Sequence, residues 1–317
     1  MSQSWGLVAT LKAAPEAVLD FVAWHLELGA AHLYLYIDDP KDPVYSILQA
    51  IPKVSAILCD DAHWGEIGRR PRRHQPRQTA NATQAYQREA PLDWLAHIDV
   101  DEFLMPQGDL GAILSTLPPD CQSARIRPME ALAPSDPAAP QRFKRFSHAP
   151  KLRQAQTARI YPEYGPWLNG GFLSHVAGKL FVRPGIPGAE FRIHNLLTEQ
   201  GQNPGQRELD RIALGHFHAS DRDAWLAHFH FRLSQGAYRT ELKPAKAGQE
   251  TLHGLLTRIS QTRGDAGLID FFEATCRDTP ALRGRLDTEG LLAEARMDFA
   301  ALRDRYFPAH TLPETLT

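Results

Sequence analysis

The 317-residue sequence predicts an α/β fold in which helices wind around a parallel sheet. The first observation is that short runs rich in β-branched and aromatic residues alternate with helical patterns over the first 117 residues. The second is that three successive strand patterns end in aspartates, and the carboxyl ends of parallel strands meet at one edge of a sheet. That edge is expected to carry Asp38, Asp39, Asp60, Asp61, Asp99 and Asp101.

Strand and helix patterns follow one another in a regular order in this part of the chain. The predicted strands are Leu7–Leu11, His32–Ile37, Val54–Leu58 and the apolar run that begins at Trp94. The predicted helices begin at Pro15 and end before Gly29, cover Val44–Ala50, and cover Gln75–Glu89. This βαβαβαβ order is typical of a parallel sheet.

Beyond Leu117 the pattern changes to shorter strands, longer loops and then helices. Proline, serine and alanine in Pro128–Pro140 predict a loop without regular structure. Short strands are expected at Leu180–Val182 and Phe191–Ile193, around a Pro/Gly turn. Helices are expected at Ala224–Ala237, Leu252–Thr262, Leu268–Thr275 and Leu291–Tyr306.

The segment Trp94–Leu104, WLAHIDVDEFL, is the most informative part of the sequence. Asp99 and Asp101 are one residue apart, so an extended backbone would direct both carboxylates to one face and Val100 into the core. Clustered acids repel each other without a counter-charge, and a hard divalent cation such as Mg²⁺ or Mn²⁺ neutralises them. Because such ions fill their other positions with water and phosphate oxygens, the pair indicates a phosphorylated ligand; an acidic strand end exposed to water is the alternative.

Composition and charge exclude several classes of protein. The formal net charge of −2 lacks the basic excess of a nonspecific nucleic-acid binder, so no nucleic-acid partner is expected. The three cysteines, Cys59, Cys121 and Cys276, form neither a disulfide framework nor a zinc motif, which favours the reducing cytoplasm. The sequence contains neither a signal-peptide pattern nor a stretch of the ~20 apolar residues that would span a bilayer. At most, peripheral contact with the inner face of a membrane is expected.

A basic loop follows the third predicted strand. It contains Arg69, Arg70, Arg72, Arg73, His74 and Arg77. Guanidinium groups suit phosphate oxygens, so this loop is expected either to hold a diphosphate or an anionic acceptor, to touch anionic lipid headgroups, or to be a solvated charged loop.

Four segments in this order resemble a known enzyme family. They are FVAWHLELGAAHLYLYIDD, HIDVDEFL, GKLFVRPG with FRIHNL, and LGHFHASDRDAWLAHFHFRLSQGAYR. Together they resemble the family 92-like branch of the GT-A glycosyltransferases and its bacterial relatives described as glycosyltransferase family 2-like. The resemblance spans residues 5 to 240. It implies a GT-A domain over residues 1–240, with a nucleotide-sugar-binding half (1–117), an acceptor half (118–240) and a C-terminal helical extension (241–317).

The resemblance also implies a mechanism and a set of site residues. Asp99 and Asp101 would be the D-x-D motif that joins Mn²⁺, or Mg²⁺, to the diphosphate of a UDP-linked sugar. Thr10, Lys12, Asp38 and Asp39 lie where such folds hold the base and ribose. Relatives commonly carry an Asn-Glu pair where this chain has Leu11-Lys12, so Lys12 is either a phosphate contact or a solvated residue at a helix start.

A third metal ligand and a general base complete the implied site. GT-A folds often use a histidine as the third ligand, and His194 is the first choice, followed by His216 and His218. Imidazole suits Mn²⁺ better than Mg²⁺. Inverting transfer needs a base near the acceptor hydroxyl, and Glu163 in YPEYGPW is the candidate. The aromatic residues Tyr161, Tyr164 and Trp167 would either stack on a sugar or pack on the core.

The expected activity is sugar transfer to a carbohydrate or lipid-linked hydroxyl acceptor, as in surface polysaccharide synthesis. Two other functions remain as alternatives. A non-catalytic carbohydrate- or nucleotide-binding protein could keep the same fold. A D-x-D phosphohydrolase of the haloacid-dehalogenase type would use the first aspartate as its nucleophile. Such enzymes carry Thr or Val two positions after the second aspartate, where this chain has Phe103.

Overall fold

The computed structural model describes residues 2–88, 92–136, 138–234 and 250–308. Contacts divide the chain into two compact units, each with its own core. Unit 1 comprises Met1–Pro128, Ala177–Leu214 and Asp298–Thr317, and unit 2 comprises Met129–Val176 and Gly215–Met297. The predicted boundary at 240/241 lies outside the described residues, and the boundary at 117/118 remains a prediction.

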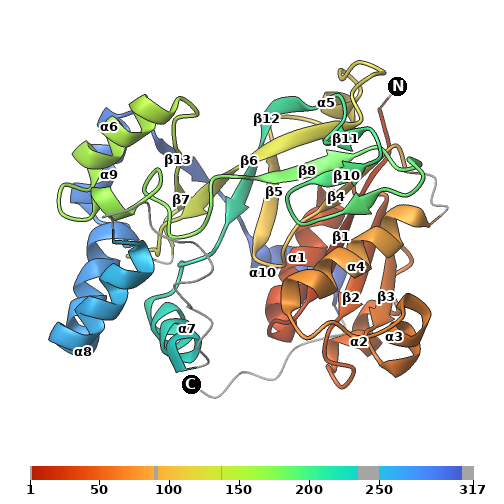
Figure 1. Cartoon of the computed structure of the whole chain (residues 1–317), viewed down its shortest axis with the longest axis horizontal. Helices are drawn as coiled ribbons and strands as arrows, with labels where there is room; N and C mark the ends of the chain where they lie inside the picture. Colours follow the sequence, from red (N-terminus) through yellow and green to blue (C-terminus); the bar gives the residue numbers. More distant parts are fainter. Residues whose placement is uncertain (1, 89–91, 137, 235–249, 309–317) are drawn as a thin grey trace. The chain divides into compact units, whose positions relative to one another are not determined.

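Unit 1 contains the strand and helix alternation that the sequence predicts (Figure 1). Its first elements are β1 (Trp5–Leu11), α1 (Pro15–Glu27), β2 (His32–Ile37), α2 (Val44–Leu48), β3 (Val54–Leu58), α3 (Asp61–Ile67), α4 (His74–Gln87), β4 (Trp94–His97), β5 (Glu102–Pro106) and α5 (Leu110–Leu114). Later segments add β8 (Lys179–Val182), β9 (Glu190–Phe191), β10 (Leu196–Thr198), β11 (Gly201–Gln202) and α10 (Phe299–Tyr306). The strands β6 (Ser123–Ala131) and β12 (Arg207–His216) begin in unit 1 and end in unit 2.

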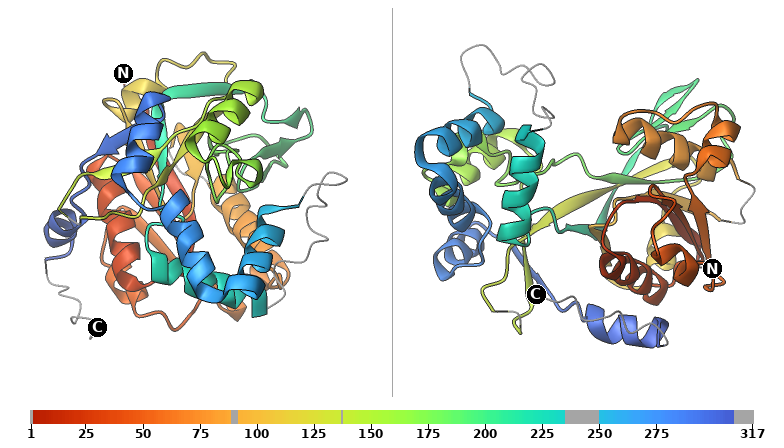
Figure 2. Two further views of the ribbon diagram at one scale, coloured as in Figure 1. Left: turned by 90° about the vertical axis from the view of Figure 1, so that its left-hand side faces the viewer. Right: turned by 90° about the horizontal axis from the view of Figure 1, so that it is seen from below.

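The sheet of unit 1 is mixed. Its order is β6-β8-β4-β1-β2-β3, in which β4, β1, β2 and β3 are parallel and β8 is antiparallel to β4 and β6. Helix α1 lies on one face of this sheet and α4 on the other, as Figure 2 shows. The predicted α/β fold with a parallel half and a mixed central sheet is therefore confirmed.

Buried side chains hold α4 and the small sheet β11-β10-β9 against the parallel strands. Val8, Tyr36, Ala82 and Phe191 belong to one apolar cluster. The helix α4 is polar in sequence, but Gln78, Asn81, Ala82 and Ala85 are all buried on its inner face. Polar side chains on this face need partners inside the protein, and these partners lie at the carboxyl ends of the strands.

Unit 2 is mainly helical. It contains β7 (Gln141–Lys144), α6 (Pro150–Ile160), η1 (Gly165–Trp167), α7 (Arg222–Ser234), α8 (Leu252–Thr275), α9 (Pro280–Thr288) and β13 (Leu292–Ala295). Its core includes Tyr164, Trp225, Phe271 and Phe272. The predicted helix Ala224–Ala237 corresponds to α7, and its residues 235–237 lie outside the described residues. The two helices predicted over 252–275 form α8, which has a kink at Gly264.

Several predicted elements are wrong in part. The predicted loop Pro128–Pro140 begins as strand, because β6 continues to Ala131 and pairs with β7 there. The first residues of the predicted helix Leu291–Tyr306 form β13, since pairing with β7 outweighs local propensity. The strand predicted at Phe191–Ile193 is β9, Glu190–Phe191.

The sequence does not predict helix α3, and this helix gives Asp60 and Asp61 structural positions at its start. Asp60 is its N-cap and accepts a hydrogen bond from the His63 amide at 2.9 Å, while Asp61 begins the helix. Asp60 therefore has a structural partner at the end of β3.

Among the described helices, none has the length and apolarity needed to cross a bilayer.

Candidate functional site

The acids after β4 lie in a tight turn. The Glu102 amide donates to the Asp99 carbonyl at 3.0 Å, and the Asp99 amide donates to Oε2 of Glu102 at 2.8 Å. Val100 and Asp101 are half-buried residues of this turn. The expectation of an extended Asp99–Asp101 segment with Val100 in the core is thus wrong, because the buried Glu102 carboxylate closes the turn through the backbone.

A buried lysine supplies the counter-charge that the local sequence lacks. Nζ of Lys179, at the start of β8, lies 2.5 Å from Oδ2 of Asp99 and 2.9 Å from Oε2 of Glu102. The side chains of Lys179 and Glu102 are fully buried. Burial alone would lower the pKa of Lys179, but the Asp99 and Glu102 carboxylates raise it above its ordinary value, so the ammonium stays charged.

Helix α4 holds the second oxygen of Asp99. Gln78, which is buried, donates from Nε2 to Oδ1 of Asp99 at 2.5 Å. Both Asp99 oxygens therefore have partners within the protein, which fixes the carboxylate in one orientation. Each carboxylate oxygen has two lone pairs, so Asp99 keeps the capacity to bind a further cation.

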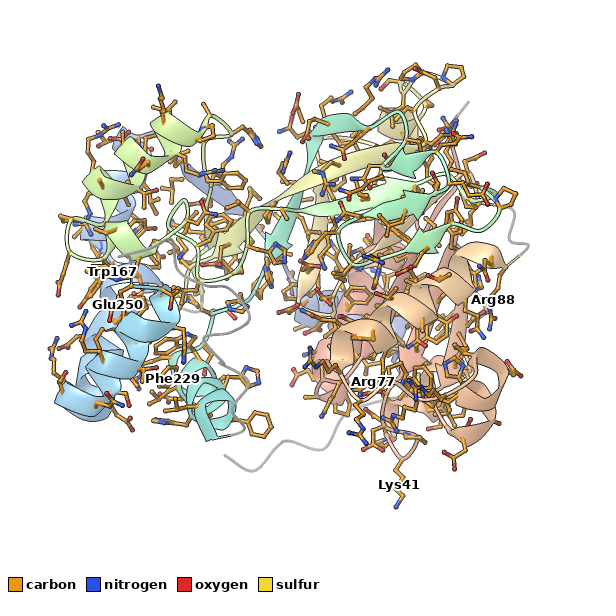
Figure 3. The ribbon with its side chains drawn as sticks, in the orientation of Figure 1. Lys41, Arg77, Arg88, Trp167, Phe229 and Glu250 are labelled. Atoms are coloured by element: carbon orange, nitrogen blue, oxygen red, sulfur yellow. The ribbon has the colours of Figure 1, made fainter. Side chains whose placement is uncertain are left out.

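Asp38, at the end of β2, is bonded by two arginines of the basic loop. Oδ2 accepts from Nη2 of Arg77 at 2.9 Å, and Arg70 donates to both Oδ1 and the backbone oxygen of Asp38. Figure 3 labels Arg77 on α4. Asp39 is exposed, and its Oδ1 accepts a hydrogen bond from the Lys41 amide at 3.0 Å. The buried Asp38 thus anchors part of the basic loop.

Thr10 and Lys12, at the end of β1, have different environments. Thr10 is buried, and its hydroxyl accepts from Nδ2 of Asn81 at 3.0 Å. Asn81 in turn contacts Nε2 of His63 at 2.9 Å. Lys12 is exposed, one residue beyond the strand. The hydroxyl of Thr10 therefore has a structural partner, whereas Lys12 faces solvent.

The strand ends lie within electrostatic reach of one side chain, His74 at the start of α4. Desolvation and the charge of Arg77 lower the pKa of His74, while Asp99 and Asp38 act on it in the opposite direction. Because Arg77 and Gln78 of α4 bond Asp38 and Asp99, the ends of β2 and β4 meet beside the first turns of this helix, as the strand-end pattern predicts. Together we name Lys12, Asp38, Asp39, Asp99 and Asp101 the carboxyl edge.

His194 lies in a bend between β9 and β10, not directly after a strand as expected. Its Nδ1 is 2.8 Å from the carbonyl oxygen of Gly178, which can only accept, so Nδ1 carries the proton and Nε2 carries the lone pair. Burial and the charge of Lys179 lower its pKa to about 4, which keeps the ring neutral at pH 7. A neutral imidazole with an oriented Nε2 is the form that binds metals.

The other candidate histidines belong to unit 2. The ring centroids of His216 and His218 are 5.2 Å apart, and those of His175 and His216 are 6.2 Å apart. Beside them, the fully buried pair Glu130 and Lys144 has a 2.9 Å separation. Burial would raise the pKa of Glu130, but Lys144 and His218 lower it to about 2.

Glu130 also fixes the loop that leads to His175. Its carboxylate accepts from the amides of Leu173 and Ser174 at 3.0 and 2.9 Å, and from the Ser174 hydroxyl at 2.6 Å. A buried carboxylate with these partners is ionised and immobile. The position of His175 is therefore set by a charge in the core of unit 2.

Glu163 is an exposed residue of the turn after α6. Its aromatic neighbours Tyr161 and Tyr164 are buried, Tyr164 in the core of unit 2, which favours the core-packing interpretation over sugar stacking for both. Trp167 is half-buried, and its Nε1 donates to Glu250 at 3.1 Å. Figure 3 labels both residues. The role of Glu163 as a general base remains a prediction.

Lys179, Gln78 and the pairing of Asp38 with arginines cannot be recognised as parts of the site from the sequence. One signal existed for Lys179, because a lysine opens the short apolar strand KLFV, and a buried lysine needs an acidic partner. No local pattern identifies which acid that partner is, since Lys179 and Asp99 are 80 residues apart.

No protein-family model and no curated protein matches the sequence. Among solved structures, glucosyl-3-phosphoglycerate synthase from Mycobacterium tuberculosis, in complex with Mn²⁺, UDP and glucosyl-3-phosphoglycerate, matches with a TM-score of 0.29 and 14% identity over 57% of each chain. HddC from Yersinia pseudotuberculosis matches with a TM-score of 0.27 and 10% identity over 44% of this chain and 67% of its own. The bifunctional glycosyltransferase WbbM matches with a TM-score of 0.27 and 12% identity over 58% of this chain and 32% of its own. Likenesses this low carry no argument about activity.

Proposed function

We propose that this chain is a metal-dependent GT-A glycosyltransferase. It transfers a sugar from a UDP-linked donor to a hydroxyl of a carbohydrate or lipid-linked acceptor, with inversion, as in surface polysaccharide synthesis. The proposed location is the cytoplasm or the inner face of a membrane.

One observation supports this proposal most strongly. Asp99 is held by Gln78 and Lys179 at the carboxyl end of β4, where open α/β sheets bind their ligands. A purely solvated acidic turn would not need a fully buried lysine and a buried glutamine to orient one carboxylate. Such support on both oxygens is typical of a functional carboxylate held in a fixed geometry.

The charges and donor atoms of this turn fit a divalent cation. Asp99, Asp101 and Glu102 contribute three negative charges and Lys179 one positive charge, which leaves two negative charges. Carboxylate oxygens and the Nε2 lone pair of His194 are a donor set that Mn²⁺ accepts. Such an ion, when bound, neutralises the charge that develops on the departing UDP.

Each residue then has a defined task. Asp99 and Asp101 would hold the ion with His194, or with His216 or His218 in its place. Lys12, Thr10, Asp38 and Asp39 are the proposed contacts of the nucleotide. Glu163 is the proposed general base, which removes the proton from the acceptor hydroxyl.

A panel of nucleotide-sugars tests this function. UDP-sugars are expected to raise the melting temperature only in the presence of Mn²⁺, and the enzyme should slowly hydrolyse the preferred UDP-sugar without acceptor. Binding without any hydrolysis would favour a non-catalytic binding protein. Hydrolysis of simple phosphate monoesters, with no response to nucleotide-sugars, would instead favour the phosphohydrolase. Asp120→Asn, an exposed acid paired with Arg207, is the matched control and should behave as wild type.

A further inference from the structure

The basic loop is more than a partner for Asp38. Residues 69–73 and Pro76 line a cavity of about 660 Å³. We name this the arginine cavity; its lining residues are Arg69, Arg70, Pro71, Arg72, Arg73 and Pro76. Four of the six lining side chains are guanidinium groups, in a chain whose net charge is −2.

Arg77 fixes the shape of this loop. Its Nη1 donates to the carbonyl oxygens of Pro71 and Arg72 at 3.2 and 3.1 Å, while its Nη2 donates to Asp38. The loop is therefore tied to the end of β2 through its backbone. A loop held in this way keeps its arginines together although their charges repel.

Three of the other four arginines are not neutralised within the described residues of unit 1. Arg70 is paired with Asp38. Arg69, Arg72 and Arg73 are exposed, and within residues 2–88, 92–136, 138–234 and 250–308 their guanidinium groups have no ion pair or hydrogen bond. Of the five arginines, with Arg77 included, two share the carboxylate of Asp38 and three have no acidic partner among the described residues. Such an excess of like charge at a fixed site favours a bound anion.

The start of α4 adds to this preference. The helix begins at His74 beside the cavity, and it has neither a capping side chain nor an acid in its first turn. A phosphate monoester presents three oxygens and can therefore accept paired hydrogen bonds from more than one guanidinium group, whereas the single atom of chloride cannot form such a pair.

We propose that the arginine cavity binds a phosphate ester group of a ligand other than the donor nucleotide. The group belongs either to a soluble phosphorylated molecule or to an anionic lipid headgroup, and both present the same tetrahedral anion. Arg70 both lines this cavity and bonds Asp38, so the ligand would adjoin the carboxyl edge. The binding is independent of the proposed transferase activity.

The test compares two triple variants of the full chain. In the first, Arg69, Arg72 and Arg73 are changed to Gln; in the control, Arg207, Arg222 and Arg258 are changed to Gln, which removes the same charge from exposed ion pairs. Glycerol 3-phosphate is titrated in EDTA, and sedimentation is measured with vesicles of phosphatidylglycerol or of phosphatidylcholine. Circular dichroism confirms that both variants are folded.

The wild type and the control should bind the phosphate probe, and the cavity variant should bind it at least ~10-fold more weakly. Binding to glycerol 3-phosphate supports a soluble ligand, and binding to phosphatidylglycerol vesicles alone supports a headgroup. Equal loss in both triple variants would mean a nonspecific charge effect and would overturn the site. Loss of UDP affinity in the presence of Mn²⁺ for the cavity variant alone would assign the arginines to the nucleotide and would also overturn it.

Discussion

Lys179→Met removes the ammonium bonded to Asp99 and Glu102 but keeps an apolar side chain of similar length. Glu102 is fully buried, so its carboxylate would be left without that cation. Breaking a buried ion pair from one side costs about 3–5 kcal/mol. In a domain of this size 1 kcal/mol corresponds to about 2–4 °C, so the melting temperature should fall by about 6–20 °C at pH 7. Lys53→Met, an exposed lysine of unit 1, is the control and should change it by less than about 2 °C.

The same variant reports on the cation. Without Lys179 the turn is more negative, so Mn²⁺ should stabilise Lys179→Met more than it stabilises the wild type. An ion at 100 times its dissociation constant contributes about 2.7 kcal/mol. The measurement is thermal unfolding by circular dichroism with Mn²⁺ and with EDTA. A loss of stability as small as that of the control, or the same Mn²⁺ response in both proteins, would refute the role assigned to Lys179.

Three further predictions concern the turn, the histidines and pH. Asp101→Asn should abolish sugar transfer with a native circular dichroism spectrum, because the amide lacks the charge that holds a cation; turnover within a few-fold of wild type would make Asp101 structural. His194→Ala should weaken Mn²⁺ binding, followed by titration calorimetry, more than His216→Ala or His218→Ala does, and the reverse ranking would move the third ligand to unit 2. Burial, opposed by the Phe21 carbonyl, lowers the pKa of His25 to about 3. The unfolded chain takes up this proton near pH 6.5 and the folded protein does not, so stability falls as the pH drops below 6.5, by about 1.4 kcal/mol per pH unit. Urea unfolding between pH 7 and pH 5 measures how the free energy of unfolding depends on pH. Below pH 6.5 this dependence should be weaker in His25→Gln than in the wild type, by about 1.4 kcal/mol per pH unit. The same dependence in both proteins would contradict the lowered pKa of His25.

The parallel half of the fold could be predicted from the sequence because each element carries its own pattern. Strand His32–Ile37 agrees with β2 residue for residue, and Pro15 begins α1 as its fixed φ angle favours. The meeting of Asp38 and Asp99 at one edge also follows from the order of strands and helices alone.

Features that depend on distant partners could not be predicted. The polar residues Glu130 and Lys144 lie in strands because each neutralises the other in the core, and neither segment shows this alone. The turn at Asp99 depends on Glu102 and on Lys179, which is 80 residues away in sequence. Local sequence patterns identify the acidic residues of this site. The lysine that pairs with them is brought there by tertiary packing and cannot be identified from the local sequence.

The affinity for UDP with and without a divalent ion tests the central claim most directly. Asp99 and Asp101 repel a diphosphate unless a cation lies between them, although Lys179 reduces that repulsion. Titration calorimetry in Mn²⁺ should give a dissociation constant at least ~10-fold lower than in EDTA, and Asp101→Asn should remove the difference while Asp120→Asn keeps it. Equal affinity for UDP in Mn²⁺ and in EDTA would contradict a metal-bridged nucleotide site at the carboxyl edge.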